Sequence, residues 1–233
     1  MWLERVVASM ARAAHEAGVP IVAGDTKVVE RGKADGLYVN TTGVGVVDPH
    51  CRPGPRLACP GDVVIVSGPI ARHGMAIMAA RESLAFESTI TSDSACLVPL
   101  VGCLKASGAR LHVLRDPTRG GVASALNEIA TASDVAITLE EEALPVPENV
   151  RAACEMLGFD PLYVANEGVL LAIVPRVDST RALGALRSHP LGQDAVIIGS
   201  VHDAPAATVV LRTALGGTRI VDLLPGEQLP RIC

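Results

Sequence analysis

Apolar residues recur at two different spacings within the first fifty positions of the chain. Between residues 3 and 17 they fall every three or four positions, which predicts a helix, and Gly18 follows as its C-terminal stop. The apolar run 19–24 then predicts a short buried strand, and the run 37–47 predicts a longer one. The charged stretch between these two runs indicates a loop.

From residue 62 onward, apolar runs of strand length alternate with amphipathic stretches of helical spacing. Strands are predicted at residues 62–68, 109–114, 135–140, 167–174, 194–201, 207–213 and 218–224. Helices are predicted at residues 73–84, 94–107, 121–133, 147–158 and 177–188. This alternation indicates an α+β fold, an α/β sandwich in which helices stack on a sheet. Residues 48–62 are rich in proline and glycine without periodicity, so they read as a connection between two units.

Composition restricts the core and excludes some partners. Of the 233 residues 49% are hydrophobic but only 2% are aromatic, so the core has to be built from valine, isoleucine, leucine and alanine. The net charge is -5, and no basic stretch interleaved with aromatic residues suggests a nucleic-acid surface. No apolar run reaches the roughly 18 residues that a membrane-spanning helix needs, and the first residues do not resemble a signal peptide. We therefore expect a cytoplasmic protein that binds neither membrane nor nucleic acid.

The six cysteines show no spacing typical of a metal site. No pair is separated by two residues, so a structural zinc site is not predicted, and cytoplasmic thiols are expected to be reduced. Cys96, Cys103 and Cys154 lie in apolar helical patterns and are predicted to be small core residues. Cys51 and Cys59 flank a loop and receive no role. Cys233, the last residue, is either incidental or a thiol that has to travel.

Three polar stretches could carry chemistry, and the first is Ala-Gly-Asp-Thr-Lys-Val-Val at 23–29. It follows a predicted strand, and ligands often bind at strand ends in α/β folds. Asp25 could hold a divalent cation, while Thr26 and Lys27 could contact phosphate oxygens. A solvated turn would have the same sequence, so both interpretations stay open.

The second stretch, Arg-Asp-Pro-Thr-Arg-Gly-Gly at 115–121, precedes a predicted helix. Thr118 or Asp116 could cap that helix, and its N-terminus together with Arg119 would attract an anion. Gly120 and Gly121 would let the backbone approach a ligand closely. The alternative is a tight loop whose glycines serve turn geometry and close packing.

The third stretch, Val-Ala-Asn-Glu-Gly-Val-Leu at 164–170, contains Asn166 and Glu167 just before an apolar strand. A carboxylate there could act as a base or as a cation ligand. The alternative is a polar turn that ends at Gly168. His73 could be catalytic, although a single histidine that opens a helix is more often a cap or a surface residue.

Five sequences in a fixed order carry a resemblance to a known family. They are GDTKVV, NTTGVG, RDPTRGGVASALNEIA, DPLYVANEG and the terminal PRIC. Together they resemble the HypE family of hydrogenase maturation proteins, which are carbamoyl dehydratases of the aminoimidazole-ribotide-synthetase-like (PurM-like) superfamily. The resemblance runs from residue 3 to the last residue, and the terminal Pro-Arg-Ile-Cys is its most specific part.

The resemblance implies a particular reaction and particular partners. A HypE protein receives a carbamoyl group on its terminal cysteine from HypF and uses ATP to dehydrate it to a thiocyanate. The cyanide then passes to iron on the HypC–HypD complex during maturation of NiFe-hydrogenases. The family works as a homodimer, and ATP with Mg²⁺ would be the cofactors.

The resemblance also assigns roles in this chain. Cys233 would be the carrier and Glu167 the base or a further cation ligand. Asp25, with Mg²⁺, and Lys27 would lie by the phosphates. The remaining cofactor-binding assignments are Thr26, Asn166, Arg119, Gly120 and Gly121.

The resemblance further implies how the chain is divided. Residues 1–50 are expected to be the remnant of a PurM-like N-terminal domain for ATP binding and dimerisation, because the long segment that precedes this helix in the family has no counterpart here. Residues 51–61 would be a linker, 62–222 the PurM-like C-terminal domain, and 223–233 a flexible tail that carries the terminal cysteine. Ala71-Arg72 stand where the family has Gly-Asp.

Two other functions remain open from the sequence. One is another ATP-using PurM-like synthetase, such as a selenophosphate synthetase, although those enzymes do not end on a carrier cysteine. The other is a non-catalytic module that docks on HypF or HypC–HypD without turning over ATP.

Overall fold

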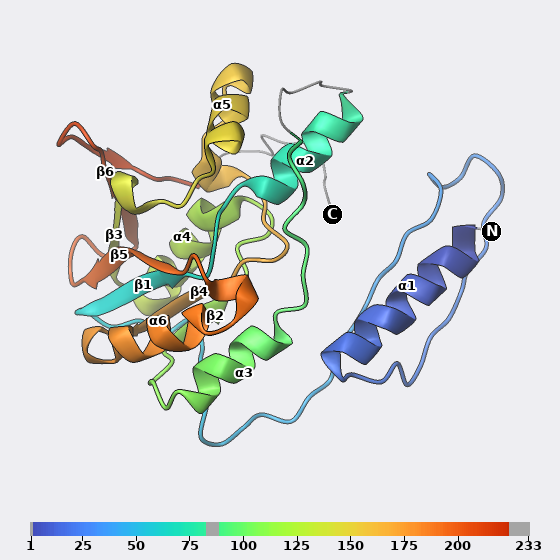
Figure 1. Ribbon diagram of the computed structural model, residues 1–233, viewed down its shortest axis with the longest axis horizontal. Coiled ribbons are helices and arrows are strands. Elements are labelled where there is room, and N and C mark those ends of the chain that lie inside the picture. Colours follow the sequence, from blue (N-terminus) through green and yellow to red (C-terminus); the bar gives the residue numbers. More distant parts are fainter. Residues whose placement is uncertain (1, 83–88, 224–233) are drawn as a thin grey trace. The chain divides into compact units, whose positions relative to one another are not determined.

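A computed structural model of the chain describes residues 2–82 and 89–223. It separates two compact units, which divide between Asp48 and Pro49 (Figure 1). Among the described residues, no helix combines the length and the apolar character needed to cross a membrane. Cys233 and the rest of the predicted tail from residue 224 lie outside the described residues.

The first unit contains one helix, α1 (Trp2–Ala17), followed by residues without regular structure. Gly18 has a φ of 66°, which confirms the predicted stop. The two strands predicted at 19–24 and 37–47 are wrong for the structure as described. A strand requires a hydrogen-bonded neighbour, and the described residues of the unit supply none, so their valines remain exposed.

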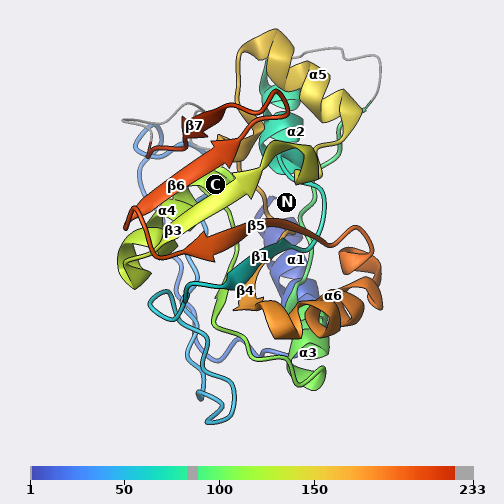
Figure 2. The ribbon, with the colours of Figure 1, turned by 90° about the vertical axis from the view of Figure 1, so that its left-hand side faces the viewer.

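The second unit is built on a single seven-stranded sheet, which confirms the predicted α+β fold. Its strands are β1 (Asp62–Val66), β2 (Val113–Arg115), β3 (Ala136–Glu140), β4 (Leu171–Pro175), β5 (Val196–His202), β6 (Thr208–Arg212) and β7 (Thr218–Ile220). They lie in the order β2-β4-β1-β5-β3-β6-β7, of which Figure 2 labels the strands from β4 to β7. Every pair is antiparallel except β3 with β6.

Helices cover both faces of this sheet, so the interior strand β1 is buried throughout. Val64 and Val66 contribute to a core with α4 (Gly121–Ser133), while Val63 and Ile65 face a second core with α3 (Val98–Ala106) and α6 (Ser179–Arg187). This is the alternation that a pleated strand produces when both of its faces are covered. A third cluster joins α2 (Arg72–Arg81) to α5 (Glu148–Leu157) and includes Cys154.

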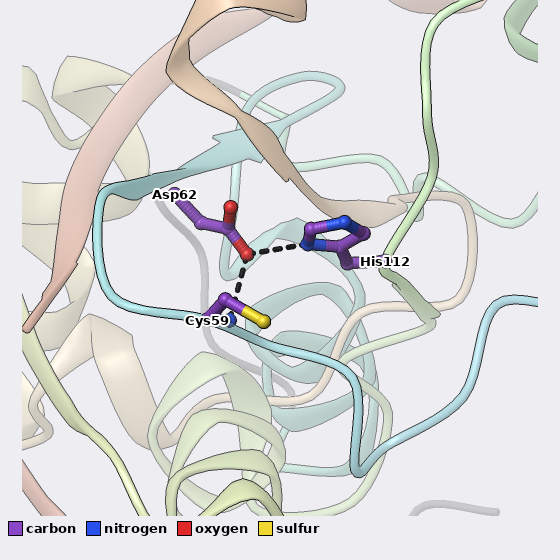
Figure 3. A group of neighbouring side chains, drawn as sticks. All are labelled: Cys59, Asp62 and His112. Carbon is purple, nitrogen blue, oxygen red and sulfur yellow. Dashed lines mark hydrogen bonds and ion pairs between the residues drawn. The ribbon is translucent and has the colours of Figure 1, made fainter.

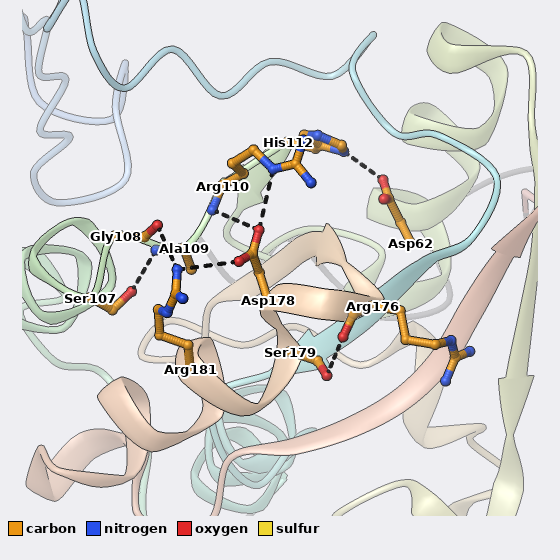
Figure 4. A network of polar contacts seen from close by, with 10 residues as sticks. All are labelled: Asp62, Ser107, Gly108, Ala109, Arg110, His112, Arg176, Asp178, Ser179 and Arg181. Atoms are coloured by element: carbon orange, nitrogen blue, oxygen red, sulfur yellow. Dashed lines mark hydrogen bonds and ion pairs between the residues drawn. The ribbon is translucent and has the colours of Figure 1, made fainter.

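Some predicted boundaries shift for identifiable reasons. The strand predicted at 109–114 begins only at Val113, because the main-chain N–H and the guanidinium of Arg110 both donate to Asp178 (Figure 4). Burial alone would raise the pKa of Asp178, but these hydrogen bonds and the charges of Arg110 and Arg181 bring it below its ordinary value. The helix predicted from residue 94 begins at Val98, where Pro99 occupies its first turn.

The cysteines of the second unit divide by burial. Cys154 is fully buried, as predicted, and burial, assisted by the nearby charge of Asp160, raises the pKa of its thiol to about 11. Cys96 and Cys103 are only half-buried, so the prediction that they are core residues is wrong. Cys96 precedes α3 and Cys103 lies within it, and neither belongs to the core cluster to which Leu100 and Leu104 of this helix contribute.

Candidate active site

Asn166 ties together three loops at one end of the sheet. Its Oδ1 accepts a hydrogen bond of 2.7 Å from the N–H of Ala71, and its Nδ2 donates to the carbonyls of Pro117 at 2.9 Å and Val164 at 3.1 Å. The side chain is only 1% exposed. The start of α2, the loop before α4 and the loop before β4 therefore meet at this one amide.

Asp93, which received no predicted role, ties a fourth segment to the loop of Glu167. Its carboxylate accepts from the N–H groups of Glu167 at 3.2 Å and of Gly168 at 3.3 Å. A Cβ on Gly168 would lie 1.7 Å from the carbonyl oxygen of Asp93, so only glycine allows this approach. Asp93 lies in a polar stretch without periodicity, which offered no signal beyond the carboxylate itself.

Glu167 is the half-buried acid of this end of the sheet. Burial raises the pKa of its carboxyl, His73 opposes that shift, and the negative charges of Asp93 and Asp116 add to it. A carboxylate that is partly desolvated and flanked by like charges binds a proton more readily than one in water. This is the property that a general base needs near neutral pH.

His73 and Arg72 connect α2 to the segment that carries Asp93. Nδ1 of His73 lies 2.9 Å from the hydroxyl of Ser92, and its Nε2 is inaccessible and has no hydrogen-bond partner among the described residues. The guanidinium of Arg72 donates to Thr91 at 2.8 Å. His73 is not a cap, because Ala71 occupies that position with a φ of 69°.

Helix α4 begins at the two predicted glycines, and no side chain caps it. Gly120 is the N-cap with a φ of 72°, so the prediction that Thr118 or Asp116 caps the helix is wrong. A Cβ on Gly121 would lie 2.4 Å from the carbonyl oxygen of Leu162, so close packing requires this glycine. The N-terminus keeps its partial positive charge next to Arg119, which is exposed and pairs with no described residue.

The predicted phosphate residues of the first unit are exposed side chains. Asp25, Thr26 and Lys27 are all open to solvent, and the N–H of Thr26 donates to Oδ1 of Asp25 at 2.8 Å. In the second unit, the structure brings Asn166 and Glu167 together with the loop that holds Arg119, Gly120 and Gly121. The residues predicted to bind phosphate in the first unit and the predicted acid, Glu167, in the second are thus each described within their own unit.

Comparisons with known proteins identify the family of the chain. Residues 59–212 match the AIR synthase related protein C-terminal domain, and residues 1–47 match the corresponding N-terminal domain. These two matches place the chain in the AIR synthase related class of proteins.

Individual relatives narrow that class. Carbamoyl dehydratase HypE of Azotobacter vinelandii is 54% identical over 99% of this chain and 68% of its own length. A crystal structure of HypE in complex with ATP matches with a TM-score of 0.88 and 47% identity over 99% of this chain and 70% of that one. A HypE–HypF complex matches with a TM-score of 0.86 and 46% identity over 95% of this chain and 72% of that one.

The chain belongs to the HypE family of carbamoyl dehydratases, as the sequence resemblance indicated. It spans about two thirds of the length of the curated relatives that it matches.

Proposed function

We propose that this chain acts in NiFe-hydrogenase maturation by dehydrating a carbamoyl group on Cys233 to a thiocyanate at the expense of ATP. Family membership over 99% of the chain supports this function. Within the structure, the observation that supports this function most directly is the environment of Glu167. The half-buried carboxyl of Glu167 has a raised pKa, and Asp93 fixes the loop before β4 by accepting from the main-chain N–H of Glu167. This carboxyl is suited to remove protons from an amide nitrogen.

The dehydration requires two changes at the carbamoyl group. Its oxygen has to become a leaving group, which is the chemistry that ATP supplies when bound. Its nitrogen has to lose both protons while the carbon–oxygen bond breaks, so that a carbon–nitrogen triple bond forms. Glu167 takes the first of these protons, and the second passes to the departing phosphate, which carries away the carbamoyl oxygen. The sulfur of Cys233 stays bonded to the carbon throughout.

The phosphate-binding assignments follow from charge and exposure. Lys27 and Thr26 offer a cation and a hydroxyl, and Asp25 is the carboxylate that would hold Mg²⁺. Arg119 and the uncapped start of α4, at Gly120 and Gly121, offer positive charge to phosphate oxygens. Among these residues the side chains of Thr26, Lys27 and Arg119 are exposed, as contact with an anionic ligand requires.

For Asn166 we propose a positioning role in this reaction. Both N–H groups of its amide donate to main-chain carbonyls and its oxygen already accepts from the N–H of Ala71, so this buried amide has no free donor for a nucleotide. Its contribution is to hold the loop of Glu167 against the loop of Arg119.

The partners follow the same proposal. HypF would donate the carbamoyl group, and the complex of HypE with HypF supports this partner. HypC–HypD would accept the cyanide, a second copy of the chain would complete a homodimer, and the reaction would take place in the cytoplasm. The selenophosphate synthetase alternative is not favoured, because relatives that are 54% and 45% identical to this chain and a crystal structure that is 48% identical are HypE.

The test follows the fate of the carbamoyl group on the protein by mass spectrometry, with HypF, carbamoyl phosphate and ATP present. The Glu167→Gln variant should accept the group but leave it as a thiocarbamate, while Cys233→Ala should accept none. Glu128→Gln is a matched control, because Glu128 is an exposed acid that pairs with Arg115. Thiocyanate formation by Glu167→Gln at the normal rate would exclude the base role.

Calorimetric titration with ATP separates the enzyme from a docking module. The enzyme should bind ATP, and Lys27→Ala should weaken that binding by about tenfold or more, as expected for one lost charge-assisted contact. Capture of HypF without any ATP binding would favour the docking module instead.

A further inference from the structure

Three side chains with different donor atoms converge at the end of β1 that lies away from the loop of Glu167. Cys59, Asp62 and His112 each offer one ligand atom, and these atoms all lie within 4.8 Å of one another (Figure 3). Asp62 pairs with Pro175 at the far end of β4, whereas Val66 pairs with Leu171 just after the Glu167 loop. The cluster is therefore separated from the candidate active site by the length of the strand.

Cys59 and Asp62 are the two ends of a tight turn, Cys-Pro-Gly-Asp. The N–H of Asp62 donates to the carbonyl of Cys59 at 3.0 Å, and Gly61 takes a φ of 90°, as a glycine following proline does in a type II turn. The N–H of Gly61 also donates to the carbonyl of Val201 in β5 at 2.9 Å. Two intervening residues are the spacing at which paired ligands chelate one zinc ion.

The carboxylate of Asp62 is fixed inside this turn. Its side chain is only 4% exposed, and Oδ2 accepts from the N–H of Cys59 at 2.8 Å and from Nδ1 of His112 at 2.7 Å. A buried carboxylate requires such partners.

His112 is held by main-chain contacts on both sides. Its main-chain N–H donates to the carbonyl of Ile173 in β4 at 3.0 Å. Its main-chain carbonyl accepts from the N–H of Gly54 at 2.9 Å. Two residues earlier, Arg110 is bonded to Asp178 through both its main chain and its side chain (Figure 4). The imidazole is thus positioned by the sheet rather than by a mobile loop.

We propose that Cys59, Asp62 and His112 form a binding site for a divalent transition metal ion of the zinc type. A thiolate, a carboxylate and an imidazole are the three donors that zinc binds in proteins, and the two negative charges balance the charge of the ion. Cys59 is exposed, which gives the ion a route of entry and leaves a fourth position open to water. Three protein ligands with one open position are typical of exchangeable zinc.

For the nitrogen and oxygen ligands, only a small adjustment separates the present geometry from a coordinated one. Nitrogen and oxygen ligands of a tetrahedral zinc ion lie about 3.3 Å apart, so the contact between His112 and Asp62 would lengthen by about 0.6 Å. The competing interpretation is an Asp62–His112 pair that only neutralises a buried carboxylate. An Asp62–His112 pair needs no thiol, so whether Cys59 takes part in metal binding distinguishes the two interpretations.

The experiment titrates the full-length reduced protein with Co²⁺ and follows its absorption in the near ultraviolet and visible. One bound ion should produce a thiolate-to-metal charge-transfer band, and added Zn²⁺ should abolish that band by competition. Cys59→Ser should remove the band, and His112→Gln should weaken binding by about 100-fold or more while the protein stays folded.

Two other thiols provide matched controls. Cys51→Ser changes the other cysteine of the same connecting segment, and Cys233→Ser removes the terminal thiol; both variants should keep the band and the affinity. Absence of a charge-transfer band in the native protein would overturn the proposal. A band that survives Cys59→Ser but disappears in either control would overturn it as well, because the thiolate would then come from elsewhere.

Discussion

β1 and the apolar runs of the first unit have similar sequences but differ in structure. β1 is bonded to β4 on one side and to β5 on the other, and its valines are 0% exposed. In the run 37–47, Val44 and Val46 are 99% and 101% exposed and belong to no strand. A β-branched run is thus suited to pairing, but whether it becomes a strand depends on a partner elsewhere in the chain.

The largest difference in stability between the two units is expected from replacing a glycine by alanine. Gly121→Ala places a methyl group 2.4 Å from a carbonyl oxygen at a φ of 61°. We expect a loss of about 3 kcal/mol or more in the free energy of unfolding, measured by urea denaturation followed by circular dichroism. Gly24→Ala in the first unit has nothing within 4 Å and should change it by less than about 0.5 kcal/mol. Equal effects would contradict this account of the packing.

Thiol reactivity contrasts the interior of the second unit with its surface. The pKa of Cys154 is raised to about 11 from an ordinary 9.0, which lowers its thiolate fraction by about 100-fold at neutral pH. Cys154 should therefore react with a disulfide reagent at least about 100-fold more slowly than the exposed Cys59. Peptide mapping of the labelled protein measures both sites at once. The difference should disappear in denaturant, and its persistence there would point to a cause other than folding.

The same substitution at two valines compares the buried run of β1 with the exposed run 37–47 of the first unit. Val64→Ala removes two methyl groups from a fully buried position in β1 and should cost about 2 kcal/mol of unfolding free energy. Val46→Ala makes the same change at a fully exposed position and should cost almost nothing. Thermal or urea denaturation of both variants is the measurement. A large loss for Val46→Ala would mean that this run is covered in solution.

The smallest expected effect on stability is that of removing the charge of Glu167. Because the folded protein raises the pKa of this carboxyl, its contribution to stability is complete below the ordinary value of 4.5 and is lost as the pH rises through the raised value. Glu167→Gln should therefore stabilise the protein slightly at pH 7, by less than about 1 kcal/mol since the group is partly solvated.

That gain should vanish near pH 4, as melting temperatures at the two pH values would reveal. Glu128→Gln, which changes an exposed and paired acid, should not gain stability at pH 7. A gain for Glu167→Gln that is independent of pH would point to packing rather than charge.

Sequence periodicity predicted the second unit well because its elements are covered by one another. The helix predicted at 121–133 has those bounds in the structure, since one apolar face packs on the sheet and the other is polar. Periodicity did not reveal that Arg110 would bind Asp178, because the two lie 68 residues apart. The strands predicted in the first unit are wrong for the same general reason, since pairing depends on distant residues.

The candidate site was predictable only in part. Asn166 and Glu167 were signalled by polar residues just before an apolar strand, and the structure places both in the loop before β4. Asp93 and the group of Cys59, Asp62 and His112 were not signalled, because only the folded sheet brings them to their neighbours. Whether the predicted residues bind phosphate or act on the carbamoyl group stays a prediction.

The position of β1 in the sheet has a consequence for how the chain is made. It is the first strand of the second unit to be synthesised, yet its partners begin only at Leu171 and Val196. At ordinary translation rates of about 5–20 residues per second, more than 100 residues take about 5–20 s or longer to follow it. A strand that ends fully buried therefore waits unpaired on the ribosome, and chaperones have that interval in which to bind it.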